Sequence, residues 1–387
     1  MTELLSPTTA PAAPPALARR TYYPALTGLR FVVALMVFAK HFRPATTPDW
    51  VVLIIEQFHM TMSMFFLLSG FVMGSRYQDE ATFTRPWWKR YVWRRLARVY
   101  PMYLVLNTSI LLYTYWPVPA GQLGHTALLF FLSETLLRGL SSTLKYVGLP
   151  QAWSLTAEEC FYFTLPILLV LWRRYGYRGA TAFALGILFI GLTLTAVCRN
   201  QPALHGFFGS FHHLFNFTFF GRVLEFTLGV GLARWWNNRL TESRPGWPWR
   251  TTLSLALMLA GGVVLVKLNS PFDWYDGNVR PATIALNVVF YPLCMTLLLA
   301  GLLTESTWLR TFLATPLLDA LGKRAYAFYL VQIGFLSIWW RAQFGWGHYI
   351  GWQLLATVLA AELLYRLLEE PARRWVLART LPRGEWS

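Results

Sequence analysis

An arginine and a histidine stand inside the first long apolar stretch of the chain, residues 22–42. Arg30 and His41 are eleven positions apart, so a helix places them on nearly one face, roughly 16 Å apart. Ionisable side chains within an apolar helix are costly and indicate function. An imidazole can accept a proton from a hydroxyl group, and a guanidinium can bind phosphate oxygens. The structural alternatives are a snorkelling arginine and a histidine at a helix end.

A pair of glutamates begins a later apolar stretch, in the segment WSLTAEECFYFTLP. The topology inferred below puts Glu158 at the same membrane level as His41. We therefore expect the Glu158 carboxylate to orient the histidine ring and to stabilise its charged form, as in other acid–base pairs. Capping of the helix N-terminus is the structural alternative for this pair, and it is sufficient to explain Glu159.

Arginines are concentrated in the segment YVWRRLARVYP. Arg95 and Arg98 lie where the chain enters its third apolar stretch from the side rich in positive charge. The planar guanidinium fork fits phosphate oxygens, so together with Arg30 these residues suit an anionic cofactor from the cytosol. Topology signalling with contact to anionic lipids is the simpler alternative.

Two further pairs interrupt apolar runs. Ser69 and Gly70, in MFFLLSGFVMGSR, are small residues of the kind that let two membrane helices approach closely. Arg222 and Glu225, in FFGRVLEFTLGVGLA, are three positions apart and share a helix face. They form either a further polar site or a structural ion pair.

The overall composition indicates the class of protein to which these residues belong. Of the 387 residues, 55% are hydrophobic and 13% are charged, against about 25% charged in soluble domains. This excludes a disordered chain and disfavours a soluble enzyme. The net charge of +16 is attributed to cytoplasmic loops rather than to nucleic-acid binding. The three cysteines lack CxxC spacing, so neither a disulfide framework nor a metal site is predicted.

The apolar stretches recur at close to the roughly 20 residues that a bilayer-spanning helix needs. We predict an all-α polytopic membrane protein with about ten transmembrane helices, and a short re-entrant or interfacial helix at 125–137. The predicted spans lie near 22–42, 51–75, 99–116, 155–172, 179–197, 217–235, 251–268, 283–303, 325–341 and 350–368.

The distribution of positive charge sets the orientation. With both termini in the cytoplasm, the inside segments hold 23 Lys and Arg residues and the outside segments hold 6. The domain prediction is a disordered cytoplasmic tail at 1–21, a membrane domain at 22–374 and a short cytoplasmic tail at 375–387. A bacterial cell membrane is the expected location, and the sequence leaves the oligomeric state open.

Seven motifs in order, Arg30-x10-His41, FFLLSGF, RRLARVYP, WSLTAEECFY, FGRVLEFTLGV, LGKRAYAFYLV and RLLEEP, resemble the acyltransferase 3 family of integral membrane O-acyltransferases. The resemblance covers about residues 23 to 374. It implies acyl transfer from acyl-CoA to a hydroxyl group of a sugar or natural product. It also implies an essential Arg30–His41 pair, a motif glutamate at Glu158, a CoA site at Arg95 and Arg98, and a polar pair at Arg222 and Glu225.

Two positions depart from the family pattern. Ala325 and Gln332 stand where relatives often have serine and histidine, which leaves the acceptor open. Chain length and composition resemble actinomycete enzymes that acylate macrolide antibiotics, and a cell-surface or lipid-linked glycan is the alternative acceptor. An acyl-histidine intermediate and direct transfer are both compatible with the residues. In another class, buried Arg, His and Glu also suit a proton-coupled transporter.

Overall fold

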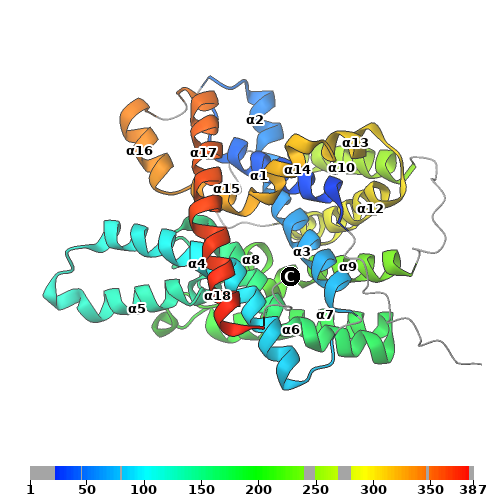
Figure 1. The fold of residues 1–387 in the computed structure, drawn as a ribbon, viewed down its shortest axis with the longest axis horizontal. Helices are drawn as coiled ribbons and strands as arrows, with labels where there is room; N and C mark the ends of the chain where they lie inside the picture. The colour runs from blue at the N-terminus through cyan, green and yellow to red at the C-terminus, as the bar shows by residue number, and fades with distance from the viewer. Residues whose placement is uncertain are drawn as a thin grey trace, which may run out of the picture.

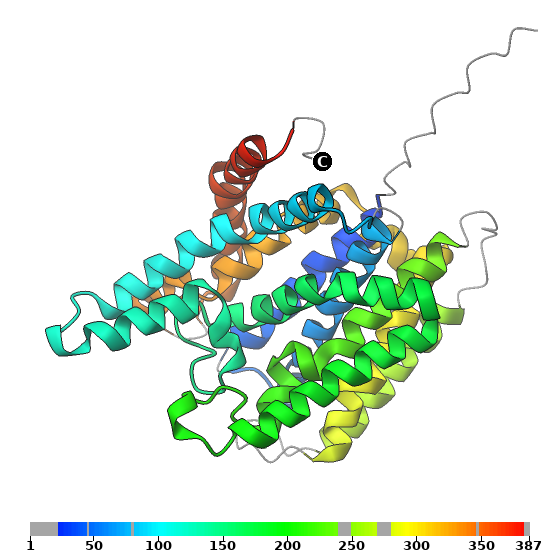
Figure 2. The ribbon, with the colours of Figure 1, turned by 90° about the horizontal axis from the view of Figure 1, so that it is seen from below.

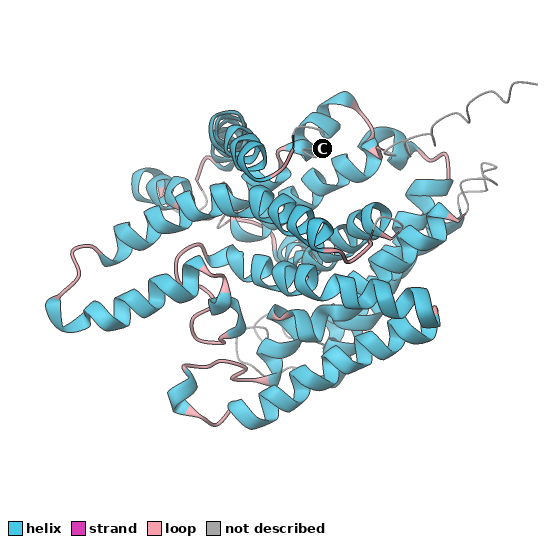
Figure 3. Ribbon diagram, turned by 60° about the horizontal axis from the view of Figure 1, so that its bottom comes forward, coloured by secondary structure: helices cyan, strands magenta, loops and turns pink. Residues whose placement is uncertain are grey.

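The computed structural model describes residues 22–44, 46–78, 81–238, 249–268, 280–345 and 348–382. Helices joined by loops make up this part of the chain, and no strand occurs in it (Figure 3). The predicted all-α architecture is therefore confirmed. The tail predicted at 1–21 lies outside the described residues.

Eighteen α-helices follow one another along the described ranges, with short 3-10 or π-helical turns between several of them. In chain order they are α1 (Pro24–His41), α2 (Asp49–Glu56), α3 (Thr61–Tyr77), α4 (Arg85–Tyr115), α5 (Leu123–Glu134), α6 (Trp153–Tyr175), α7 (Tyr177–Cys198), α8 (Phe211–Phe217), α9 (Phe219–Asn237), α10 (Trp249–Leu268), α11 (Pro281–Ala285), α12 (Tyr291–Thr304), α13 (Trp308–Leu313), α14 (Pro316–Lys323), α15 (Ala325–Gln332), α16 (Phe335–Phe344), α17 (Ile350–Leu364) and α18 (Glu370–Thr380).

Seven helical segments of the described chain are long and apolar enough to cross a bilayer. This confirms a polytopic membrane protein. The segments are Pro24–His41, Asp49–Tyr77, Pro150–Tyr175, Tyr177–Cys198, Trp249–Leu268, Pro281–Thr304 and Ile350–Thr380.

Three of the ten predicted spans are not in this set. The predicted third span is the C-terminal half of α4, whose N-terminal half carries the arginine cluster. The predicted sixth span is α9, which holds the charged residues Arg222, Glu225 and Arg234. The predicted ninth span is divided into α15 and α16 by extended backbone at Ile333 and Gly334. Charged residues in two of the predicted spans and a helix interruption in the third therefore explain why these three are not in the set.

The closest helix packing in the bundle is between α3 and α9. A methyl group added to Gly70 would overlap the carbonyl oxygen of Phe226, and one added to Gly229 would overlap that of Leu67. Glycine on both helices is thus what lets the two backbones come together. This contact fixes α3 in the middle of the molecule, where it passes close to α1 and α6 (Figure 1).

Helices α4 and α5 lie side by side and extend away from the rest of the bundle (Figures 1 and 2). The α5 helix has 12 residues, so it is about 18 Å long, against a bilayer core of about 30 Å. Such a helix is too short to cross. A side chain from α4 also ties the two together, because Tyr103 donates a hydrogen bond to the carbonyl oxygen of Ser133, 2.5 Å away.

The C-terminal helix α18 packs on the N-terminal half of α4 (Figure 2). Leu377 and Leu381 are buried against Ala97 in a small apolar cluster. The domain boundary predicted at residue 374 falls inside α18, whose helix continues to Thr380. This packing brings the RLLEEP segment beside the arginines of α4.

Candidate active site

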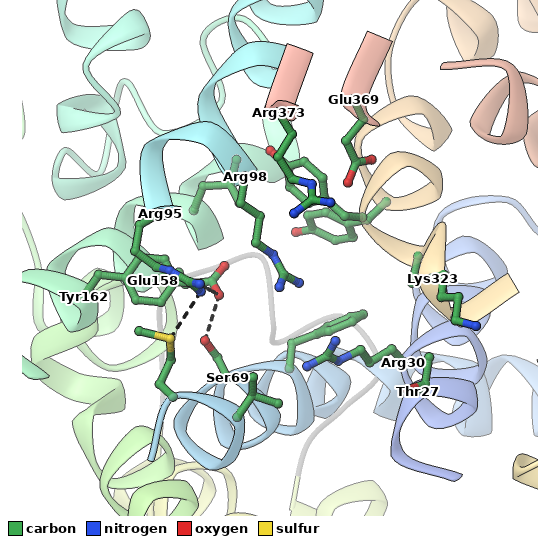
Figure 4. A pocket seen from close by; sticks show the side chains of 18 of the residues that line it. Thr27, Arg30, Ser69, Arg95, Arg98, Glu158, Tyr162, Lys323, Glu369 and Arg373 are labelled. Carbon is green, nitrogen blue, oxygen red and sulfur yellow. Dashed lines mark hydrogen bonds between the residues drawn. The ribbon is translucent and has the colours of Figure 1, made fainter. Parts of the chain in front are cut away.

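A cavity of about 380 Å³ lies where α1, α3, α4, α6, α15 and α18 meet (Figure 4). That volume is in the range of small-molecule sites, about 300–1,000 Å³. Seven cationic side chains and three carboxylates line it, so positive charge is in excess. They are Arg30, Arg76, Arg94, Arg95, Arg98, Lys323 and Arg373, and Glu158, Glu369 and Glu370.

One face of α3 forms a wall of this cavity. Its lining side chains recur at three- and four-residue intervals, as one stripe of a helix does. Fourteen steps separate the first from the last, which is about 21 Å along the helix axis. The stripe is apolar except for one hydroxyl at its middle and one cation at its end: Met62, Phe65, Phe66, Ser69, Val72, Met73 and Arg76.

Arg95 is held rigidly at the cavity wall. Its side chain is buried, and its Nη1 lies 3.2 Å from the sulfur of Met73. The guanidinium carbon also lies 5.9 Å from the ring centroid of Tyr77 and 5.6 Å from that of Tyr162. Aromatic rings stabilise a cation without neutralising it. Tyr91 supports the arrangement by donating a 2.6 Å hydrogen bond to the carbonyl oxygen of Tyr162.

Arg30 and Arg98 reach into the open part of the cavity from α1 and α4 (Figure 4). Neither has a salt-bridge partner among the described residues, although they are close enough to act on one another electrostatically. Two partly buried arginines that face one space repel each other, and a bound anion relieves that repulsion. The cavity thus favours an anionic ligand.

The cationic mouth contains paired residues as well. Arg373 is bound by both carboxylate oxygens of Glu370, at 2.9 Å each. Lys323 donates a 2.8 Å hydrogen bond to Asp319, and this bond raises the pKa of Lys323. Both cations are therefore partly neutralised by their partners. Arg30 and Arg98 are attracted by Glu158 and Glu369 but form no salt bridge in the described chain. With Arg95, they are therefore the strongest candidates for contact with an anion.

Glu158 points into the same cavity from α6 (Figure 4). Ser69 donates a 2.7 Å hydrogen bond to its Oε1, and Tyr162, one turn along α6, donates to the same oxygen. Arg30 is close enough for an electrostatic attraction. Glu159 points elsewhere, because its carboxylate accepts a 3.0 Å hydrogen bond from Tyr100. The two adjacent glutamates thus have different surroundings.

His41 lies outside this cavity. It ends α1, three helical turns beyond Arg30, and it is exposed. The charged groups that act on it are Lys40 and Glu56. The predicted contact between His41 and Glu158 is not present, because Glu158 lies at the level of Arg30. From the sequence, Glu158 is expected at the level of His41, whereas in the structure it lies beside Arg30, three helical turns away along α1.

The two small residues of α3 face different partners. Gly70 faces α9, at the close approach of the two helices, whereas Ser69 binds Glu158 in the cavity wall. Arg222 and Glu225 form a buried ion pair on α9, with a separation of 2.8 Å. Arg222 also donates a 2.7 Å hydrogen bond to Ser63 on α3. This pair is not part of the cavity lining and links α9 to α3.

Several cavity residues were not among those predicted from the sequence. Tyr162 follows Glu158 by four positions, so the helical period could have identified it. Glu369 is in the RLLEEP motif, but only the packing of α18 on α4 shows that it faces the arginines. Of the two family departures, Ala325 lines the cavity, and Gln332 is buried at the end of α15.

The acyltransferase domain family Acyl_transf_3 matches residues 23–362. Acyltransferase MdmB of Streptomyces mycarofaciens is 26% identical over 405 residues, covering 93% of each chain. Peptidoglycan O-acetyltransferase OatA of Listeria monocytogenes is 21% identical, covering 92% of this chain and 56% of its own. No solved structure matches. With the family match spanning most of the chain, this protein belongs to the membrane acyltransferase 3 family.

Proposed function

We propose that this protein transfers an acyl group from acyl-CoA to a hydroxyl group of an acceptor. The family supports O-acyl transfer. The observation that carries the choice of donor is the pair Arg30 and Arg98, which face one cavity without salt-bridge partners in the described chain. Arg95 adds a third cation, held by aromatic rings. CoA carries phosphate groups, and the arginine fork is suited to them.

His41 is the proposed base. It takes the proton of the acceptor hydroxyl, and the oxygen then attacks the thioester carbonyl. The carbon–sulfur bond breaks, and the proton passes to the sulfur, so that the products are an ester and free CoA. Three turns of α1 separate His41 from Arg30, so this scheme places the donor phosphates and the reacting hydroxyl about 16 Å apart along one helix.

Glu158 has a different proposed role from the one expected from sequence. Anchored by Ser69 and Tyr162, its carboxylate lies beside Arg30 inside the donor cavity. We infer that it positions the Arg30 guanidinium for the donor. Arg222 and Glu225 are proposed as a structural pair, because both are buried and their hydrogen bonds reach Ser63.

A macrolide hydroxyl is the proposed acceptor, and the proposed location is the bacterial cell membrane with both termini in the cytoplasm. The match to the Streptomyces acyltransferase supports this choice, because it covers 93% of both chains. Chain length was one of the features that resembled enzymes acylating macrolides. The peptidoglycan enzyme favours a glycan acceptor, but this chain spans only 56% of it. A glycan hydroxyl is therefore the second candidate.

The test uses the full chain purified in detergent with radiolabelled acetyl-CoA. A macrolide and a peptidoglycan fragment are offered as acceptors, and mass spectrometry identifies the ester. Release of free CoA that depends on one acceptor supports the proposal and names the acceptor class. A His41→Ala protein is the matched control. Proton movement across vesicles without any acyl transfer would instead support the transporter alternative.

A further inference from the structure

The cavity has a second end whose chemistry differs from the arginine mouth. Met62, Phe65 and Phe66 of α3 lie there, with Leu155 of α6 and Tyr329 of α15. Ser154 lines this end too, and apart from its hydroxyl and that of Tyr329 the surface is apolar. An apolar end on a cavity with a cationic mouth fits a ligand that is anionic at one end and hydrocarbon at the other.

The residues at this end are held by their neighbours. The Tyr329 hydroxyl lies 2.9 Å from Ser154 Oγ and donates a 3.0 Å hydrogen bond to the carbonyl oxygen of Gln151. The Phe65 ring packs on the Tyr329 ring, with 5.8 Å between centroids. Phe66 stacks on Phe226 at 4.8 Å. The wall is therefore fixed in shape, so it can select a ligand by size.

The distance along α3 relates the two ends. Met62 and Arg76 are about 21 Å apart on one helix face, with Ser69 midway. A donor with its phosphates at the arginines thus has room to extend its thioester arm past Ser69 and Glu158. Its acyl group then lies among the apolar side chains.

We propose that this apolar end is the acyl-chain site and that Phe65 sets the length of chain it accepts. The inference rests on the proposed acyl-CoA donor. Phe65 is the side chain to choose because it is only half-buried and lines the cavity, whereas Met62 and Phe66 are buried in the core. Shortening it enlarges the site with little loss from the core.

The expected effect follows from burial of hydrocarbon. Each methylene moved from water to an apolar site contributes about fourfold in affinity. In Phe65→Ala, a butyryl chain has two methylenes more to bury than an acetyl group, so the affinity ratio of butyryl-CoA to acetyl-CoA should rise by roughly 15-fold. Phe65→Trp fills the site, so the same ratio should fall.

The experiment is isothermal titration of the purified full chain in detergent with acetyl-CoA, butyryl-CoA and hexanoyl-CoA. It compares the unchanged protein, Phe65→Ala, Phe65→Trp and Phe163→Ala. Phe163, on α6, does not line the cavity and is 61% exposed, so its variant is a control for loss of a phenyl ring elsewhere. The ratio should change in the two Phe65 variants, in opposite directions, and should stay constant in the control.

Three results would overturn the inference. A Phe65→Ala protein that binds all three donors with an unchanged ratio shows that the apolar end does not hold the acyl chain. An equal loss of affinity for every donor, matched by Phe163→Ala, shows a structural role only. If the unchanged protein binds no acyl-CoA at all, the proposed function fails together with the inference, and this outcome is distinct from the first two.

Discussion

Ser69 on α3 donates a 2.7 Å hydrogen bond to Glu158 on α6, across the wall of the cavity. Tyr162 donates to the same carboxylate oxygen. A carboxylate with two donors on one oxygen is fixed in orientation, and here it lies near Arg30. The relationship places Glu158 in the cavity wall, and the hydroxyls of Ser69 and Tyr162 orient its carboxylate.

We predict that Ser69→Ala and Glu158→Gln are coupled. Because the two side chains share a hydrogen bond, their effects on kcat/KM for acyl-CoA should depart from additivity by about 0.5–3 kcal/mol. A double-mutant cycle on purified protein measures the departure. Ser109→Ala is the control, since Ser109 is exposed and bonds only to its own helix, at the carbonyl oxygen of Val105. Additive losses would show that Ser69 acts only in packing.

Replacing the cavity arginines should weaken donor binding. A hydrogen bond to a charged phosphate contributes about 1.5–3 kcal/mol, so Arg98→Ala and Arg95→Ala should each lower acyl-CoA affinity roughly 10- to 100-fold. The KM for the acceptor should change little. Titration with acetyl-CoA measures the affinity, with Arg174→Ala, an exposed arginine at the end of α6, as the control. Unchanged affinity in both variants would restrict the arginines to a topological role.

His41→Ala should lower kcat by about 10²–10⁴-fold and leave acyl-CoA binding intact, because a general base acts on the chemical step. Since the structure separates His41 from Glu158, the losses in His41→Ala and Glu158→Gln should add within about 0.5 kcal/mol. Single-turnover measurements with saturating donor supply both numbers. Strong non-additivity would instead favour the pair expected from the sequence, and a near-normal kcat in His41→Ala would exclude its role as base.

The sequence supplied the helical membrane class and the residues Arg30, Arg95 and Arg98, which do share one cavity. It could do so because charge in an apolar run is visible without a structure. It did not predict that Glu158 lies beside Arg30 rather than beside His41. Helix tilt and vertical offset depend on packing between α3, α6 and α9, and that packing depends on close approaches such as Gly70 against Phe226. The number of positive charges in each loop gives no information about how the helices pack.

The pair Ser69–Gly70 is a second case in which the sequence could not show which element each residue faces. Their composition predicted a close helix contact, and Gly70 lies at one. Adjacent helical positions differ by about 100° around the axis, so Ser69 faces another element. Only the placement of α6 shows that this element carries a carboxylate. Likewise, the break between α15 and α16 has no strong signal in an apolar sequence.

The predicted orientation can be tested at position 145. In a chain whose three cysteines are replaced by alanine, Lys145→Cys in intact cells should react with a thiol reagent that does not cross membranes. Lys145 is half-buried in the loop before α6, where its amine binds the carbonyl oxygen of Ser142. Arg174→Cys, at the other end of α6, should react only after the membrane is opened. The reverse pattern would invert the topology.

Stability should depend on pH through His213 in α8, which lies between the spanning segments. The ring is buried, and it stacks on Phe217 with 5.6 Å between centroids. Burial lowers the pKa of His213 from 6.5 to about 3. Below pH 6.5 the unfolded chain therefore binds a proton at this site that the folded chain does not. Folding stability should fall as pH drops from 6.5 towards 3, by roughly 1.4 kcal/mol per pH unit.

His213→Phe removes the titrating group and keeps an aromatic ring against Phe217. Its melting temperature should therefore fall less than that of the unchanged protein when the pH is lowered from 7 to about 4.5. Above pH 7 the two slopes should agree, because His213 is neutral in both the folded and the unfolded chain there. His125→Phe, on the exposed surface of α5, serves as the control and should keep the full dependence. Equal pH dependence in all three proteins would show that the folded chain protonates His213 as readily as the unfolded chain does. The loss of stability in acid would then come from other groups.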